Sequence, residues 1–93
     1  MPRRSENLLK SHTEYKTKVG RKIGARINQR RTELNFSQEV LRSKLELENV
    51  LITRSRLSRL ENGETLPDAV EVLALTKVLR VSLGWLIDTD KST

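Results

Sequence analysis

Aliphatic residues recur at helical spacing along this chain, and no stretch alternates apolar and polar residues over the length of a strand. The clearest stripe is Val19, Ile23 and Ile27, with Leu34 seven residues further on. The core must be aliphatic, because the 93 residues include one Phe, one Tyr and one Trp. A chain of this length forms a single domain. The pattern predicts a compact all-α fold of five helices and disfavours a β-sandwich, whose strands are rich in aromatic residues.

Residues that start or stop helices divide the chain between about Tyr15 and Asp88. Every predicted helix after the first begins behind a Ser, Thr or Asp, and one pair has the spacing of a capping box. The N-caps are Ser37, Thr53, Asp68 (with Glu71) and Ser82, and the stop signals are Asn35 and Asn62-Gly63. We therefore expect a flexible basic arm over residues 1–13, a helical domain over 14–88 and a polar tail over 89–93.

The helical period also predicts which side chains face inward in the later helices. These are Val40, Leu41, Leu45, Leu57, Leu60, Val70, Leu73, Ala74, Leu75 and Val78. The last apolar group, Trp85 to Ile87, has two interpretations: it closes the core, or part of it is exposed as a contact surface.

Positive charge is concentrated at the start of the chain. Residues 1–35 hold ten Lys and Arg against three Asp and Glu, a local charge of +7, whereas 36–62 carry +1 and 63–93 carry −2. The three sum to the formal net charge of +6. This asymmetry indicates a polyanionic partner, for which nucleic acid and an anionic membrane surface are the two candidates.

Several classes of function are disfavoured by what the sequence lacks. There is no Cys, and the single His12 cannot build a zinc site, so we expect no metal and no cofactor. The sequence holds no cluster of catalytic residue types and no phosphate-binding glycine loop, so we expect no enzyme. The N-terminus lacks the apolar region of a signal peptide, and no run is long enough to span a membrane. A cytoplasmic, nucleoid-associated protein is expected.

The predicted helix over about 53–62 carries the candidate binding residues. With Leu57 and Leu60 facing inward, residues at steps of 100° place a polar group on the opposite side. Ser55, Arg59 and Asn62 fall near that face, Arg56 and Ser58 flank it, and Arg54 lies in the first turn. Such a two-turn helix fits the major groove of DNA, where an arginine can bond guanine O6 and N7. The same pattern would also suit a solvated basic helix face.

Residues 24–87 resemble the lambda-repressor-like helix-turn-helix family, also called the XRE family. The matching features stand in the family's order and spacing. They are Ile23, Ile27 and Arg31, then FSQEVL (36–41), TRSRLSRLENG (53–63), Pro67 and VLALTKVLRVSLGWLI (72–87). The resemblance implies a helix-turn-helix domain over 14–88 that binds an operator in double-stranded DNA as a repressor-like transcriptional regulator.

The resemblance also assigns roles to individual residues. It implies that Gln38 clamps a phosphate, that Arg54, Ser55 and Arg59 read bases, and that Asn62 approaches the next phosphate. Arg56 joins these as a candidate DNA contact. Arg31 and Glu61 are implied to form an internal ion pair, which we interpret as structural. Relatives bind palindromic sites as dimers, so a homodimer is expected, with Leu83 and Ile87 as candidates for its interface.

The chain departs from the family's pattern at three places. The segment after Leu45 (46–52, ELENVLI) is about five residues longer than the motif's usual tight turn. We expect about one further turn of helix there, and then a loop that returns Ile52 to the core. Arg80 stands where many members have Gly. The loop 63–68 (GETLPD) carries acids where some relatives bind phosphate, a loss for which the basic arm could compensate.

An alternative function uses the same fold as a protein-interaction module. Such a module would be the antitoxin of a toxin–antitoxin pair or a coactivator-like bridge, with a toxin or a polymerase as its partner. An exposed apolar patch would favour this alternative, and the segment 47–52 (LENVLI) is its candidate in the sequence.

Overall fold

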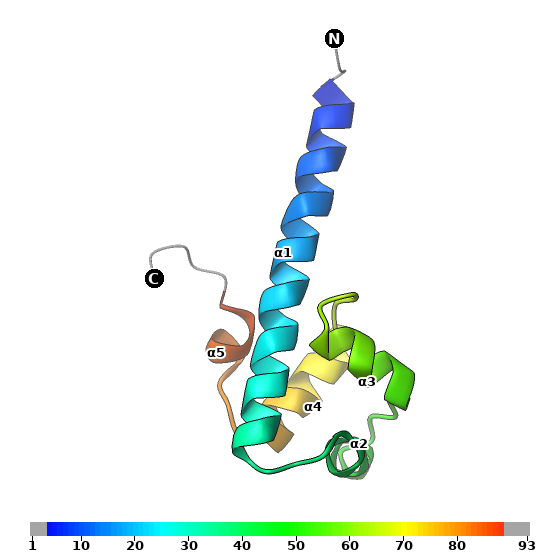
Figure 1. Cartoon of the computed structure of the whole chain (residues 1–93), viewed down its shortest axis with the longest axis vertical. Helices are drawn as coiled ribbons and strands as arrows, with labels where there is room; N and C mark the ends of the chain where they lie inside the picture. Colours follow the sequence, from blue (N-terminus) through cyan, green and yellow to red (C-terminus); the bar gives the residue numbers. More distant parts are fainter. Residues whose placement is uncertain (1–3, 89–93) are drawn as a thin grey trace.

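The computed structural model describes residues 4–88, with side chains described from residue 7 onward. Its helices are α1 (Arg4–Glu33), α2 (Gln38–Leu47), α3 (Arg54–Glu61), α4 (Ala69–Leu79) and α5 (Leu83–Ile87). No strand occurs within this part of the chain, so the all-α fold of five helices is confirmed. The C-terminal half of α1 packs against α3, α4 and α5, whereas its N-terminal half projects away from the other helices (Figure 1).

Helix α1 is longer than the sequence pattern predicts. It begins at Arg4 and continues to Glu33, so residues 4–13, expected as a flexible arm, are helical. The physical reason is that nothing interrupts the helix: no Pro follows Pro2 until Pro67, and Gly20 is the first glycine. The expected tail over 89–93 and the first three residues of the arm lie outside the described residues.

The predicted caps are present at every helix boundary for which the sequence offers one. The side chains of Ser37, Thr53, Asp68 and Ser82 each accept a hydrogen bond from a backbone N–H in the first turn of their helix. The Asp68–Glu71 capping box is complete, with both bonds at 2.8 Å. Asn35 (φ 60°) and Gly63 (φ 76°) adopt the left-handed conformation that the stop signals require. Local sequence therefore sets where these helices start and stop.

Arg80 shows how the chain manages without the glycine that many members of the resembled family have there. It takes the left-handed conformation itself, with φ 58°, as the C-cap of α4. The N–H of Val81 then donates to the carbonyl oxygen of Thr76 at 3.1 Å, which closes the end of the helix.

The core is aliphatic and draws on every helix. The most completely buried large side chains are Ile27, Leu41, Leu45, Leu57, Leu60, Leu75, Leu79 and Leu86. Three predicted core residues are wrong: Val40, Val70 and Leu73 are 41, 61 and 66% exposed. In α4 the reason is that apolar residues surround most of the helix, so its apolar surface is wider than the face that the other helices cover.

A glycine allows α1 and α3 to approach each other closely. A Cβ atom on Gly24 would lie 2.2 Å from the carbonyl oxygen of Leu60 and 2.7 Å from that of Glu61. No other residue type fits there without moving the end of α3. This contact therefore fixes how far the C-terminal end of α3 stands from α1.

The lengthened connection between α2 and α3 returns Ile52 to the core as expected, but α2 extends only two residues past Leu45 and not about one turn. Helix α2 continues to Leu47, and Asn49 then turns the chain with φ 65°. Val50 and Ile52 are buried, whereas Leu51 between them is 82% exposed. Two anchored side chains thus hold the loop and lead the chain into Thr53, the N-cap of α3.

Candidate nucleic-acid interface

Helix α3 presents a polar face to solvent and an apolar face to the core. Leu57 and Leu60 are at most 1% exposed, and Arg54, Ser55, Arg59 and Asn62 are all exposed. Within residues 7–88, no side chain forms a hydrogen bond or ion pair with the guanidinium of Arg54 or Arg59. These two guanidiniums are therefore available to an external ligand. This is the arrangement that the helical period predicts for the segment.

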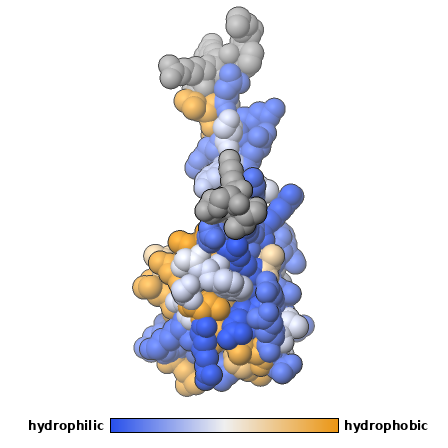
Figure 2. All heavy atoms as spheres, turned by 90° about the vertical axis from the view of Figure 1, so that its left-hand side faces the viewer, coloured by the Kyte–Doolittle hydropathy of each residue, from blue (hydrophilic) through white to orange (hydrophobic). Residues whose placement is uncertain are grey.

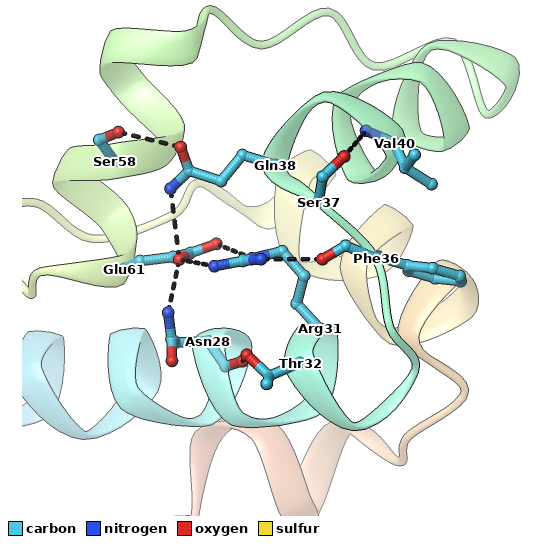
Figure 3. Close-up of polar contacts among 9 residues, drawn as sticks. All are labelled: Asn28, Arg31, Thr32, Phe36, Ser37, Gln38, Val40, Ser58 and Glu61. Carbon is cyan, nitrogen blue, oxygen red and sulfur yellow. Dashed lines mark hydrogen bonds and ion pairs between the residues drawn. The ribbon is translucent and has the colours of Figure 1, made fainter.

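Glu61, at the end of α3, binds α1 and α2 through a cluster of polar side chains (Figure 3). The guanidinium of Arg31 donates from Nε to Oε2 at 2.7 Å and from Nη2 to Oε1 at 2.9 Å. Asn28 donates a third bond at 2.9 Å, and Gln38 approaches Oε1 at 3.4 Å. Arg31 also donates to the carbonyl oxygen of Phe36, at 2.8 Å, in the turn between α1 and α2.

The Glu61 carboxylate is held in its charged form. Its side chain is 4% exposed, and burial alone would raise its pKa. The hydrogen bonds from Arg31, Asn28 and Gln38, together with the charge of Arg31, instead lower the pKa below its ordinary value of 4.5. Side chains of α1 and α2 thus bond the one carboxylate of α3, and the ion pair joins α1 to α3. None of these bonds uses the exposed side of α3.

Gln38 lies at the first residue of α2, facing α3. Its amide oxygen accepts a bond from Ser58 Oγ at 3.4 Å, while its amide nitrogen points to Glu61 (Figure 3). The side chain is half-buried between the two helices. Gln38 lies at a helix N-terminus, where backbone N–H groups lack partners within the helix, and such a position is compatible with the binding of an anion. The phosphate contact itself stays a prediction.

Arg56 requires a correction. The sequence places it among the candidate DNA contacts, but the structure commits its guanidinium to Glu71 of α4, through two bonds of 2.7 Å each. It also donates to the carbonyl oxygen of Leu66, at 3.3 Å. The Glu71 side chain is 8% exposed, and the hydrogen bonds from Arg56 lower its pKa against the opposing effect of burial. Arg56 therefore stabilises the contact between α3 and α4, and we remove it from the candidate DNA contacts.

The sequence pattern did not predict the ion pair between Arg56 and Glu71, although it did single out Glu71. Glu71 is identifiable as the reciprocal member of the capping box, which accounts for one bond to the N–H of Asp68. A carboxylate has further acceptor capacity, so a buried Glu in this position needs a donor. Only the packing of α4 against α3 shows which arginine supplies it.

Helix α5 is attached to α1 through Arg26. The guanidinium of Arg26 donates to the carbonyl oxygens of Trp85 (2.7 Å) and Asp88 (2.5 Å), and it lies 5.7 Å from the centre of the Trp85 ring. Leu86 is fully buried, whereas Leu83 and Ile87 are 47 and 39% exposed. The two interpretations of this segment thus both apply, to different residues: Leu86 closes the core, and an apolar edge remains exposed.

Comparison with known families finds a match that covers more than half of the chain. Residues 27–86 match the family model described as helix-turn-helix, a stretch that begins in the C-terminal part of α1 and ends in α5. No curated protein and no solved structure matches the chain. Helices in the described part of the chain are too short or too polar to cross a membrane.

Proposed function

Because this chain belongs to the lambda-repressor-like helix-turn-helix family, whose members bind double-stranded DNA, we propose that it is a transcriptional regulator that reads a specific operator sequence. In this proposal α3 lies in the major groove and α2 crosses the sugar-phosphate backbone. The family is one of DNA-binding regulatory domains and not of enzymes. Repression, by blocking access of polymerase to a promoter, is the mode of action that we assign to it.

The observation that supports specific binding is the exposed face of α3. Arg54 and Arg59 extend from a rigid helix without partners among the described side chains, and Ser55 and Asn62 lie on the same side. An arginine so placed can donate two parallel bonds to guanine, which distinguishes one base pair from the others. Gln38 then contacts a phosphate beside the groove, and together these residues fix the register of the helix on the DNA.

A homodimer on the operator completes the proposal. One two-turn helix contacts too few base pairs for specificity, and a two-fold dimer doubles the length of DNA that is read. Leu83 and Ile87, on the exposed edge of α5, are the candidates for the interface.

The test compares Arg59→Ala with Lys77→Ala, a control that removes one positive charge from the exposed surface of α4. The operator is first selected from a random pool with the unmodified protein. We expect Arg59→Ala to lose about 1–3 kcal/mol of binding free energy on the selected site and to relax base preference at one position. The measurement is fluorescence anisotropy on the selected and a scrambled duplex. An equal loss on both duplexes would show that Arg59 contacts phosphate and not a base.

One observation favours a second candidate function, the protein-interaction module. Leu47 and Leu51 are each 82% exposed, and the exposed Val70 and Leu73 of α4 line a shallow hollow together with Val50. Such a patch would suit the apolar surface of a toxin or a polymerase subunit. Co-purification of a protein encoded beside this one, through that patch, would favour the second candidate over a free-standing regulator.

A further inference from the structure

Residues 7–18 of α1, most of its N-terminal half, are not packed against the other helices. Residues 7–18 are all exposed, and the first residues of the helix that pack against other elements are Val19 and Gly20. Figure 1 shows this half standing clear of the other helices, and Figure 2 shows that its face turned away from α3 is mostly hydrophilic. A helix without tertiary contacts gains no stability from packing. Packing within the described residues therefore does not stabilise this half, and its exposed side chains are accessible to a partner.

One side of this projecting half continues the side of α1 that faces α3. Arg21 lies against Gly63, two residues after the end of α3, and Thr17 shares a hollow with Gly63, Thr65 and Leu66 of the next loop. A second shallow hollow adjoins the first and is lined by Thr13, Glu14, Thr17, Lys18 and Arg21. Lys10 lies on the same side, because it precedes Thr17 by seven residues, two turns of the helix.

This side carries an excess of positive charge. Lys10, Lys18 and Arg21 are exposed on it, with Glu14 as the acid among them, and Thr13 and Thr17 add hydroxyl groups. The neighbouring loop is acidic instead: Glu64 is exposed, and the Asp68 carboxylate caps α4. The loop is therefore a poor binding site for phosphate, while the helix next to it is a good one.

We propose that this side of α1, from Lys10 to Arg21, binds the phosphates of the DNA that flanks the site read by α3. The inference rests on the proposed function, since it places the DNA against the exposed face of α3. Lys10 and Arg21 are eleven residues apart, or about 16 Å along the helix axis. That length is about half a turn of B-DNA. The projecting helix thus extends the contact along the duplex without reading bases.

The apolar residues of the projecting half lie on a different side and do not compete for the same partner. Leu8 and Tyr15 are seven residues apart, two turns of the helix, and the same line continues through Val19, where packing begins, to Arg26, which contacts Trp85. That line leads to α5, which carries the candidate dimer residues Leu83 and Ile87 of the proposed function. The experiment therefore has to separate a loss of DNA contact from a loss of association between copies.

The test uses the full chain with Lys10→Gln and Lys18→Gln together. The control is Lys77→Gln with Arg80→Gln, which removes the same amount of charge from exposed positions of α4 and its C-cap, together with the ion pair between Lys77 and Glu48. DNA affinity is measured from 50 to 200 mM salt on the selected operator with long flanks, and hydroxyl-radical footprints are recorded. We expect the slope of log K against log salt to become shallower by about 1.8 per protomer and the flanking phosphates to lose protection. The control should change neither.

Two results would overturn the inference: the same slope and footprint in the variant as in the unmodified protein, or an equal change in the control. A third would be sedimentation showing that the variant has lost association between copies, which would assign the surface to a second copy. Failure of the proposed function looks different. In that case the unmodified protein does not distinguish the selected duplex from a scrambled one. The contact with flanking phosphates is then tested by comparing the salt slopes of the variant and the unmodified protein on either duplex.

Discussion

The close approach of α1 and α3 at Gly24 makes a sharp prediction about Gly24→Ala. The added Cβ would lie 2.2 Å from the carbonyl oxygen of Leu60, whereas ordinary contact begins at 3.4 Å, so the two must move apart by about an ångström. The atoms in the way belong to the backbone of α3 and cannot rotate aside. The substitution therefore displaces the end of the helix that carries Arg59 and Asn62.

The energetic cost of Gly24→Ala combines two opposing effects. Overpacking of a well-packed contact costs about 1–3 kcal/mol, and a clash with backbone lies at the upper end of that range. Replacing glycine by alanine inside a helix returns about 1 kcal/mol. We expect the free energy of unfolding to fall by about 2 kcal/mol, and the affinity for the selected operator to fall as well because α3 no longer sits at its original distance from α1.

The assay is urea unfolding followed by circular dichroism at 222 nm, the signal of helix content. Gly84→Ala is the matched control, because a Cβ there meets only Ser82 Oγ, at 4.0 Å. We expect the control to be as stable as the unmodified protein or up to about 1 kcal/mol more stable. If Gly24→Ala were as stable as that control, the contact between the two helices would be looser than described and the reasoning would fail.

Two further predictions concern the buried ion pairs. Arg56→Met leaves the Glu71 carboxylate, 8% exposed, without its guanidinium, and thermal unfolding should show that the free energy of unfolding falls by an amount near the lower end of about 3–5 kcal/mol. Adding Glu71→Gln to the same chain should recover part of this loss. The absence of any recovery would speak against the ion pair. Because the pKa values of Glu61 and Glu71 are lowered on folding, their contribution to stability is complete above the ordinary value of 4.5 and is lost as the pH falls through the folded-state values. Unfolding free energies measured from pH 7 to pH 2 should therefore decline below about pH 4.5, and Glu71→Gln should make that decline less steep.

Local signals in the sequence predicted most of the fold. The caps at Ser37, Thr53, Asp68 and Ser82 form because each depends on a side chain and a backbone N–H three residues apart, which is information contained in a short segment. The exposed face of α3 was predictable for a similar reason, since two inward leucines fix the orientation of the remaining residues.

What the sequence did not predict depends on contacts between distant segments. Arg56 looked like a free arginine because its partner, Glu71, is fifteen residues away on another helix. The outward orientation of Val70 and Leu73 depends on which side of an almost wholly apolar helix the neighbours cover. The early start of α1 escaped prediction for another reason: Leu8 and Leu9 are the apolar residues of 7–14, and two neighbouring residues do not define a helical period.

Glu61 and the exposed residues of α3 lie on the same helix, but the polar cluster around Glu61 does not contact those exposed residues. Arg31, Asn28 and Gln38 hold one side of the helix end, and Ser55 and Arg59 extend from the other side. Exchanging the outward residues therefore leaves the attachment of the helix intact. Under the proposed function, natural variants could acquire new target sequences by changing a few surface positions while the domain keeps its stability, so binding preference and foldability would evolve independently in this scaffold.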